Sequence, residues 1–126
     1  MCFTVHKRYP NPLVAKRDIV CYKTMFSSPG KEVFASMYRG FKYEIGKEYS
    51  LGKELRVRYE TGDFTCVVYR DIREGFHSFS NKKELSDAAS ESYSRVKCII
   101  PEGSTYYYNP DDREYVSDRI RIIEEI

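Results

Sequence analysis

Hydrophobic and polar residues alternate along several short stretches of the chain, a period-two pattern that is typical of half-buried β-strands. The stretch 54–60 (ELRVRYE) alternates most cleanly, with leucine, valine and tyrosine on one face and two arginines on the other. A turn signal at 61–63 (TGD) separates it from a second strand-like stretch at 64–69 (FTCVVY). We therefore expect these two stretches to form an antiparallel hairpin.

Strand-like composition recurs on both sides of this hairpin. Further stretches are rich in β-branched and aromatic residues and end at turn signals that contain glycine, proline or asparagine. They cover residues 18–25, 95–100, 105–108 and 119–123. Together with the hairpin and a stretch near 33–38 that fits either a strand or a short helix, they predict about six or seven strands.

Residues 82–92 change to a helical pattern. Leu85, Ala88 and Ala89 recur at helical spacing, and a serine and an asparagine just before the segment offer N-cap side chains. The sequence therefore predicts an α+β fold, which consists mainly of an antiparallel, twisted β-sheet with one or two short helices.

The 126-residue chain carries a formal charge of +2, which is too small to predict a nucleic-acid partner. The charge is uneven, because residues 1–17 hold basic side chains and no acidic one. Two prolines in this segment disfavour a helix. We therefore interpret residues 1–17 as a basic, extended leader and residues 18–126 as a single α+β domain.

The cysteines at positions 2, 21, 66 and 98 form no C-x-x-C pair, and the last three lie in apolar, strand-like stretches. We expect buried, reduced thiols, which are typical of the cytoplasm. No uninterrupted apolar run approaches the roughly 20 residues of a membrane-spanning helix, so no membrane partner is expected.

Motifs of several enzyme classes are missing from the sequence. There is no G-x-S-x-G elbow, no P-loop and no G-x-G-x-x-G fingerprint, and His6 and His77 do not form an H-x-x-x-H pair. We therefore expect no metal, no cofactor and no catalytic residues, which favours a binding protein over an enzyme.

The stretch 74–80 (EGFHSFS) is the strongest candidate for a ligand site, because it places an imidazole and two hydroxyls at the expected passage from strand to helix. His77, Ser78 and Ser80 would face a ligand there, together with the amides of the helix N-terminus, which attract anions. The same residues can instead be structural, with His77 bonded to a backbone carbonyl and Ser80 capping the helix.

Positive charge and an aromatic ring complete this predicted cleft. Lys23 on the first strand, and Arg39 between two aromatic rings, would hold phosphate. In a strand Tyr107 takes the opposite face from Tyr106 and Tyr108, so its ring would stack on a base or sugar. The predicted ligand is a small, phosphate-containing molecule that is similar to a nucleotide. Core packing of the tyrosines and plain surface exposure of Arg39 are the alternatives.

Distinctive motifs follow one another at 75–79 (GFHSF), 98–107 (CIIPEGSTYY) and 115–120 (YVSDRI), and 39–49 (RGFKYEIGKEY) precedes them. This order resembles an uncharacterised domain family that is common in bacteriophages and in gut bacteria of the Bacteroides kind. The likeness covers about residues 18–126. It implies a phage setting and brings no established activity.

A second set of positions, 22–23 (YK), 78–80 (SFS) and 100–104 (IPEGS), is similar to the aromatic-Arg pair, the Ser-x-Ser and the I-P-x-G-S turn of the ADP-ribosyltransferase fold. The chain departs from that pattern at two points. Lys23 stands at the arginine position, and the segment 117–119 (SDR) lacks the catalytic glutamate. The resemblance therefore implies a degenerate relative that keeps a nucleotide-sized cleft.

Three functions agree with these features. The first is a non-catalytic binder of a small, nucleotide-like molecule, encoded by a phage and acting against bacterial defence by sequestration. The second is a protein-binding inhibitor module that docks on a host enzyme, since tyrosine and arginine dominate interface hot spots. The third is an ADP-ribosyltransferase-like enzyme. The expected partner is a small phosphate-containing ligand or a host protein, and the sequence does not indicate an oligomeric state.

Overall fold

The computed structural model describes residues 3–27, 33–36, 42–61, 68–84 and 93–126. Strands account for most of these residues, and one 3-10 turn, η1 (Lys82–Glu84), follows β9. The strands in chain order are β1 (Phe3–Thr4), β2 (Leu13–Val14), β3 (Ile19–Ser27), β4 (Val33–Ser36), β5 (Lys42–Glu44), β6 (Glu48–Ser50), β7 (Arg58–Thr61), β8 (Val68–Ile72), β9 (Phe76–Phe79), β10 (Tyr93–Ile100), β11 (Thr105–Asn109), β12 (Glu114–Ser117) and β13 (Arg119–Glu125).

The α+β fold class expected from the sequence is wrong, because the regular secondary structure of the described residues is almost entirely β-strand and includes no α-helix. Leu85, Ala88 and Ala89, the positions expected to pack the helix, lie outside the described residues. The degenerate ADP-ribosyltransferase-like fold was expected as a form of this α+β class, so that expectation is wrong for the same reason. The helical signal was weak in physical terms, since an isolated helix shorter than about 12 residues is marginal in water.

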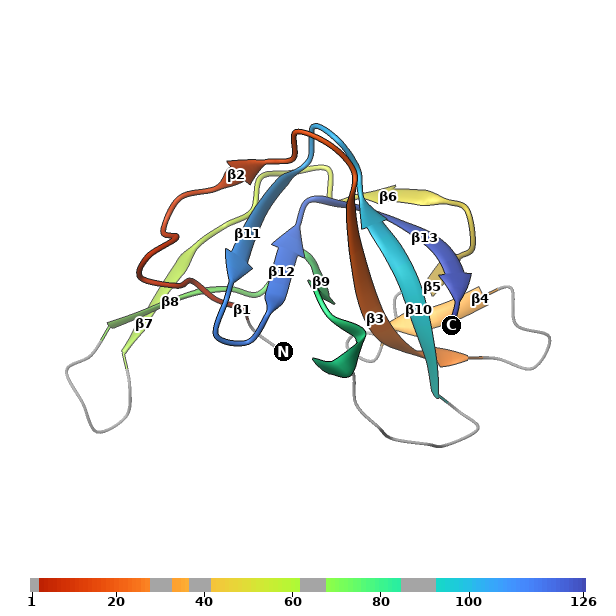
Figure 1. The fold of residues 1–126 in the computed structure, drawn as a ribbon. Helices are drawn as coiled ribbons and strands as arrows, with labels where there is room; N and C mark the ends of the chain where they lie inside the picture. The colour runs from red at the N-terminus through yellow and green to blue at the C-terminus, as the bar shows by residue number, and fades with distance from the viewer. Residues whose placement is uncertain (1–2, 28–32, 37–41, 62–67, 85–92) are drawn as a thin grey trace.

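The described strands form two antiparallel sheets (Figure 1). The larger sheet has ten strands in the order β2-β11-β12-β9-β3-β10-β13-β6, with β4 paired to β3 and β5 paired to β4. The smaller sheet has the order β1-β8-β7. In Figure 1 the large sheet bends into an arch, with β3, β10 and β13 on one side and β11 and β12 on the other. Twist between strands and a bulge at Lys97 and Cys98 of β10 allow this curvature.

The main core lies on one face of the central strands. β3 and β10 pair from Ile19 opposite Ile100 to Phe26 opposite Tyr93. Alternate residues of β3, β10 and β13 point to this face, in agreement with the period-two pattern, and most of them are fully buried. The buried residues of the main core are Ala15, Cys21, Met25, Tyr43, Phe76, Val96, Cys98, Ile100, Ile120 and Ile122.

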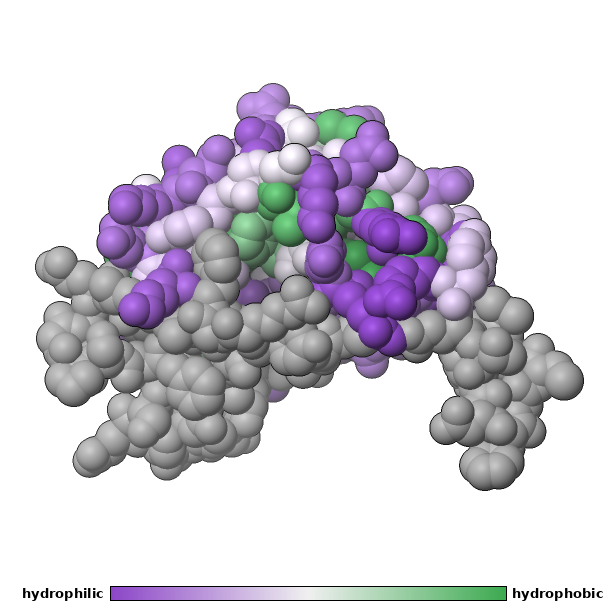
Figure 2. Space-filling view, turned by 180° about the vertical axis from the view of Figure 1, so that it is seen from behind, coloured by the Kyte–Doolittle hydropathy of each residue, from purple (hydrophilic) through white to green (hydrophobic). Residues whose placement is uncertain are grey.

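A second, smaller core joins the two sheets. Its buried residues are Phe3, Val5, Ile72, Tyr107 and Val116, with Leu55 and Val57 packed against them. β11 and β12 therefore contribute one face to each core, whereas β9 contributes Phe76 to the main core. Seen from behind, hydrophobic residues gather near the middle of the molecule, with hydrophilic residues above them and on both sides (Figure 2).

The expected strands at 18–25, 95–100, 105–108 and 119–123 are confirmed as β3, β10, β11 and β13, with small shifts at their ends. The hairpin is confirmed in part, because β7 pairs with β8 from Arg58 opposite Asp71 to Thr61 opposite Val68. Residues 54–57 precede the strand instead of forming its first half. Their apolar side chains pack into the second core, which satisfies the alternating pattern without strand pairing.

The segment interpreted as a leader takes part in both sheets. β1 pairs with β8, and β2 pairs with β11. Phe3, Val5 and Ala15 are buried, and the Ala15 amide donates to the Ser104 carbonyl at 2.8 Å. This segment therefore forms one wall of the pocket described below.

Candidate functional site

The structure separates the residues that the sequence grouped into one cleft. Lys23, Ser78 and the backbone of His77 meet beside the main core. Tyr107 belongs to the second core instead. Arg39 lies outside the described residues. Two places remain as candidates, one closed and one open to solvent.

Ser80 lies at the end of β9, where its hydroxyl is 3.5 Å from that of Tyr108. The η1 turn that follows is capped by Asn81, whose Oδ1 accepts a hydrogen bond from the Lys83 amide at 2.9 Å. A single 3-10 turn lacks the aligned amides that make a longer helix attractive to anions. The described part of this segment therefore gives no support to an anion site at Ser80.

Lys23 is an inward-facing lysine. It lies two residues from the fully buried Cys21, so strand alternation places both side chains on the core face of β3. Its ammonium group donates a hydrogen bond to the His77 carbonyl oxygen and lies 5.8 Å from the centre of the Tyr43 ring. Loss of water around the ammonium lowers the pKa of Lys23, and the electrostatic influence of the Cys98 and Cys21 thiol groups and of Glu114 opposes this shift.

Cys21 and Cys98 face each other across β3 and β10, and neither has exposed surface. The Ser78 hydroxyl is also fully buried, forms no hydrogen bond to a described nitrogen or oxygen, and lies beside the Cys21 sulfur. Burial alone would raise the pKa of Cys21. Hydrogen bonds from Cys98 and Ser78 and the charge of Lys23 outweigh this effect, so the pKa of Cys21 is lowered from its ordinary value. The hydrogen bond to Cys21, burial and the charge on Cys21 raise the pKa of Cys98.

We call Lys23, Cys21, Cys98, Ser78 and Tyr43 the Lys23 cluster. Its polar groups contact one another and the backbone. Because the thiols and the Ser78 hydroxyl have no exposed surface, a ligand as large as a nucleotide cannot reach them in this structure.

The imidazole of His77 points away from this cluster, because Ser78 and His77 alternate along β9. Its Nδ1 atom is 3.5 Å from Glu114 Oε1, and its Nε2 atom is 3.4 Å from the Arg73 carbonyl oxygen. Both distances are long for hydrogen bonds. His77 thus contacts a backbone carbonyl and a carboxylate, which matches the structural alternative stated for it above.

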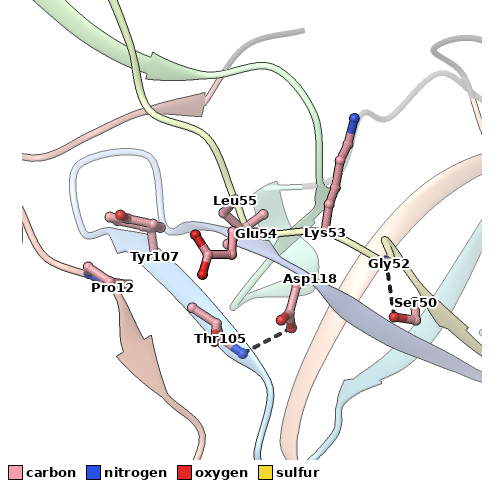
Figure 3. A pocket seen from close by; sticks show the side chains of 9 residues that line it. All are labelled: Pro12, Ser50, Gly52, Lys53, Glu54, Leu55, Thr105, Tyr107 and Asp118. Atoms are coloured by element: carbon pink, nitrogen blue, oxygen red, sulfur yellow. Dashed lines mark hydrogen bonds between the residues drawn. The ribbon is translucent and has the colours of Figure 1, made fainter.

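The open candidate is a pocket of about 560 Å³ at the rim of the second core, which we call the Tyr107 pocket (Figure 3). Its walls come from the segment before β2, the end of β6 and the segment that follows it, β11, and the β12–β13 turn. The residues that line it are Pro12, Ser50, Gly52, Lys53, Glu54, Leu55, Thr105, Tyr107 and Asp118.

Asp118, in the β12–β13 turn, forms hydrogen bonds to two of the other walls. Its carboxylate Oδ1 accepts a hydrogen bond from the Thr105 amide at 2.9 Å. Its own amide donates to the Thr105 carbonyl at 3.0 Å, and its carbonyl accepts from the Leu51 amide at 2.8 Å. The base of the pocket is therefore fixed by hydrogen bonds before any ligand binds.

The charges at the pocket are unequal. Figure 3 shows the Glu54 carboxylate directed toward Tyr107 and Thr105, whereas the Lys53 side chain points away. Lys53 forms an ion pair with Glu74. Glu54 forms no ion pair or hydrogen bond with any residue that the structure describes. The pocket thus presents carboxylate oxygens without a free cation among its lining residues.

Tyr107 supplies the aromatic surface of the pocket and is only 5% exposed. Burial raises its pKa, and the nearby charge of Arg70 partly opposes this, so its hydroxyl stays neutral at physiological pH. Leu55 is held beside it by a close approach to Gly75. A Cβ atom at Gly75 would lie 2.9 Å from Leu55 Cδ2 and 2.6 Å from Val116 Cγ2.

Of the pocket residues, the sequence predicted only Tyr107. Glu54 and Leu55 were assigned to a strand, Pro12 to a leader, and Asp118 to a position where a glutamate was missing. One signal was available, since Asp118 lies between two strand-like stretches and an aspartate at such a turn often bonds backbone amides.

We found no match to this chain among protein-family models, curated proteins or solved structures. Among the described residues, no group of histidine, cysteine, aspartate and glutamate side chains is placed to hold a metal ion. None of the helical segments in that part of the chain has the length and apolar character needed to cross a membrane.

Proposed function

We propose that this protein is a non-catalytic binder of a small molecule and that the ligand occupies the Tyr107 pocket. One observation carries the proposal: the pocket combines a buried aromatic residue with a carboxylate, Glu54, that has no partner among the described residues. Binding pockets typically pair apolar surface with a few convergent polar groups, and about 300–1,000 Å³ is the usual range of volume.

The charges support a ligand that donates hydrogen bonds or carries positive charge. Glu54 and Asp118 offer acceptor oxygens, and the ammonium of Lys53 is already paired with Glu74. A phosphate placed among these carboxylates would be repelled. We therefore propose a flat, donor-bearing molecule such as a nucleobase, a nucleoside or an aromatic amidine. A nucleotide would have to keep its phosphate in solvent.

The biological role in this proposal is sequestration of such a molecule during phage infection. It rests on the resemblance of residues 75–79, 98–107 and 115–120 to a phage domain family. The host cytoplasm is the proposed compartment, supported by Cys21 and Cys98, which are free thiols although they lie directly opposite each other.

Three probes test the proposal: adenosine, adenosine monophosphate and benzamidine. We expect adenosine or benzamidine to shift the amide resonances of Leu55, Thr105 and Asp118 in a two-dimensional NMR titration, and the monophosphate to bind more weakly than adenosine. Replacement Glu54→Gln should weaken benzamidine binding. Glu124→Gln, an exposed carboxylate on β13, is the matched control and should not.

If none of the three probes shifts these resonances, the small-molecule proposal is wrong. The protein-binding module then becomes the better candidate. Binding of all three probes with equal affinity would contradict the charge argument alone.

A further inference from the structure

The two cysteines of the Lys23 cluster have the geometry of a disulfide that has not formed. They are direct partners in the β3–β10 register. Opposed residues of an antiparallel pair have Cα atoms about 4.5–5.5 Å apart, and disulfides span about 4.4–6.8 Å. Both side chains point to the same buried face, so their sulfurs meet without a change of register.

The surroundings of the pair make its two members unequal. Lys23 lies two residues along β3 on the same face, and its positive charge favours a thiolate at Cys21. Ser78 adds a hydroxyl at the Cys21 sulfur that has no other described polar partner. Cys98 keeps its proton and hydrogen-bonds to Cys21. One thiolate next to one thiol is the arrangement that reacts in dithiol chemistry.

We propose that Cys21 and Cys98 are an oxidation site, in which a peroxide converts the pair to a cross-strand disulfide. This site lies in the main core, apart from the Tyr107 pocket, and does not depend on ligand binding. The absence of exposed sulfur limits the oxidant to a small molecule such as hydrogen peroxide, which enters during local opening of the sheet.

The chemistry balances in two steps. The Cys21 thiolate attacks one oxygen of hydrogen peroxide, the O–O bond breaks, and a sulfenic acid and hydroxide form. Hydroxide takes up a proton equivalent to the one that Cys21 had released and becomes water. The Cys98 sulfur then attacks the Cys21 sulfur, the S–O bond breaks, and the leaving oxygen departs as water with the Cys98 proton. Two thiols and one peroxide give one disulfide and two waters.

The experiment uses the full chain with Cys2→Ser and Cys66→Ser, so that only the pair remains. The folded protein is treated with hydrogen peroxide or with glutathione disulfide, and its mass is followed with time. We expect peroxide to remove two hydrogens, proteolysis to give one peptide that links Cys21 to Cys98, and dithiothreitol to restore the mass. We expect glutathione disulfide, which is too large to enter, to leave the folded protein unchanged.

Lys23→Met should slow the peroxide reaction by about tenfold, which corresponds to a rise of one unit in the pKa of Cys21. Lys97→Met is the matched control, because Lys97 neighbours Cys98 on β10 but points to the opposite face, and should react at the parent rate. In a Cys98→Ala variant, Cys21 should gain oxygen without forming a disulfide.

Three results would overturn the proposal. The first is a parent protein that keeps both thiols in peroxide while it remains folded. The second is addition of oxygen to either sulfur of the parent without a linked peptide. The third is equal rates in a folded Lys23→Met variant and in its Lys97→Met control. The first two need only the parent protein, so they hold even if Lys23→Met does not fold.

Discussion

The Lys23 cluster and the Tyr107 pocket both place polar side chains beside an apolar core. The two sites differ in whether these side chains are enclosed and paired with one another or open to solvent. In the cluster, the ammonium of Lys23 and the thiols of Cys21 and Cys98 contact one another and the backbone, and the thiols have no exposed surface. In the pocket, the Glu54 carboxylate has no described partner and is exposed. A closed arrangement satisfies its own groups, whereas an open one leaves acceptors for a ligand.

The comparison shows why a list of polar residues is a poor guide to a binding site. Lys23 and Ser78 have the chemistry to hold phosphate, but they are enclosed in the core. Glu54 and Asp118 were not predicted as ligand-binding residues from the sequence, but they border an open volume of about 560 Å³. Accessibility and pairing decide which groups are available to a ligand.

The largest effect is expected at Gly75, which approaches Val116 of the second core and Leu55 of the Tyr107 pocket. Gly75→Ala places a Cβ 2.6 Å from Val116 and 2.9 Å from Leu55, at a φ of +153° that disfavours side chains. We expect a loss of about 3 kcal/mol in the free energy of unfolding, measured by urea denaturation.

Gly46→Ala is the matched control, because Gly46 also has a positive φ, +84°, but no atom within 4 Å of its Cβ position. We expect it to cost only about 1 kcal/mol. Equal losses in the two variants would mean that the close approach at Leu55 and Val116 does not exist.

A smaller effect is expected from the hydrogen bonds at the base of the pocket. Asp118→Ala removes the acceptor of the Thr105 amide and should cost about 1–2 kcal/mol, while Asp118→Asn keeps an acceptor and should cost less. In the closed cluster, Ser78→Ala removes a buried hydroxyl without a described nitrogen or oxygen partner and should be near neutral. If Ser78→Ala lowered the free energy of unfolding more than Asp118→Ala, the contrast drawn here between the closed cluster and the hydrogen-bonded base of the pocket would be wrong.

The smallest effect is a pH dependence above pH 10 on the main-core side. Burial, aided by Tyr108, raises the pKa of Tyr115 to about 12, above the unfolded value of 10.0. The unfolded chain therefore loses this proton first. The stability that Tyr115 contributes is complete below pH 10 and is lost as the pH rises through about 12. Tyr115→Phe should reduce the fall in stability between pH 9 and pH 11, as measured by urea denaturation. An unchanged fall would contradict the assignment.

The sequence was a good guide where side-chain alternation decides the structure. β3, β10, β11 and β13 follow from it because one face of each strand is buried and the period is two. The same rule contained a signal for Lys23, since a lysine two residues from Cys21 and from Met25 must share their face. The sequence was a poor guide to the start of this segment, because Lys82–Glu84, which were expected to begin a helix, form a 3-10 turn.

The pocket could not be predicted from the sequence for a different reason. Pro12, Glu54 and Tyr107 come from segments far apart in the chain, and only the pairing of β2 with β11 and the packing of 54–57 on the second core bring them together. Segments without regular alternation carry no local signal of what they will face.

The most direct test of the account is to locate a bound probe by NMR. With benzamidine in excess, isotope-edited nuclear Overhauser spectra should connect the probe to the Tyr107 ring and to the Leu55 methyl groups, and Glu54→Gln should weaken these contacts. Contacts to Tyr43 and Met25 in the main core, or binding without any contact to Tyr107, would contradict the central claim that the open pocket is the ligand site.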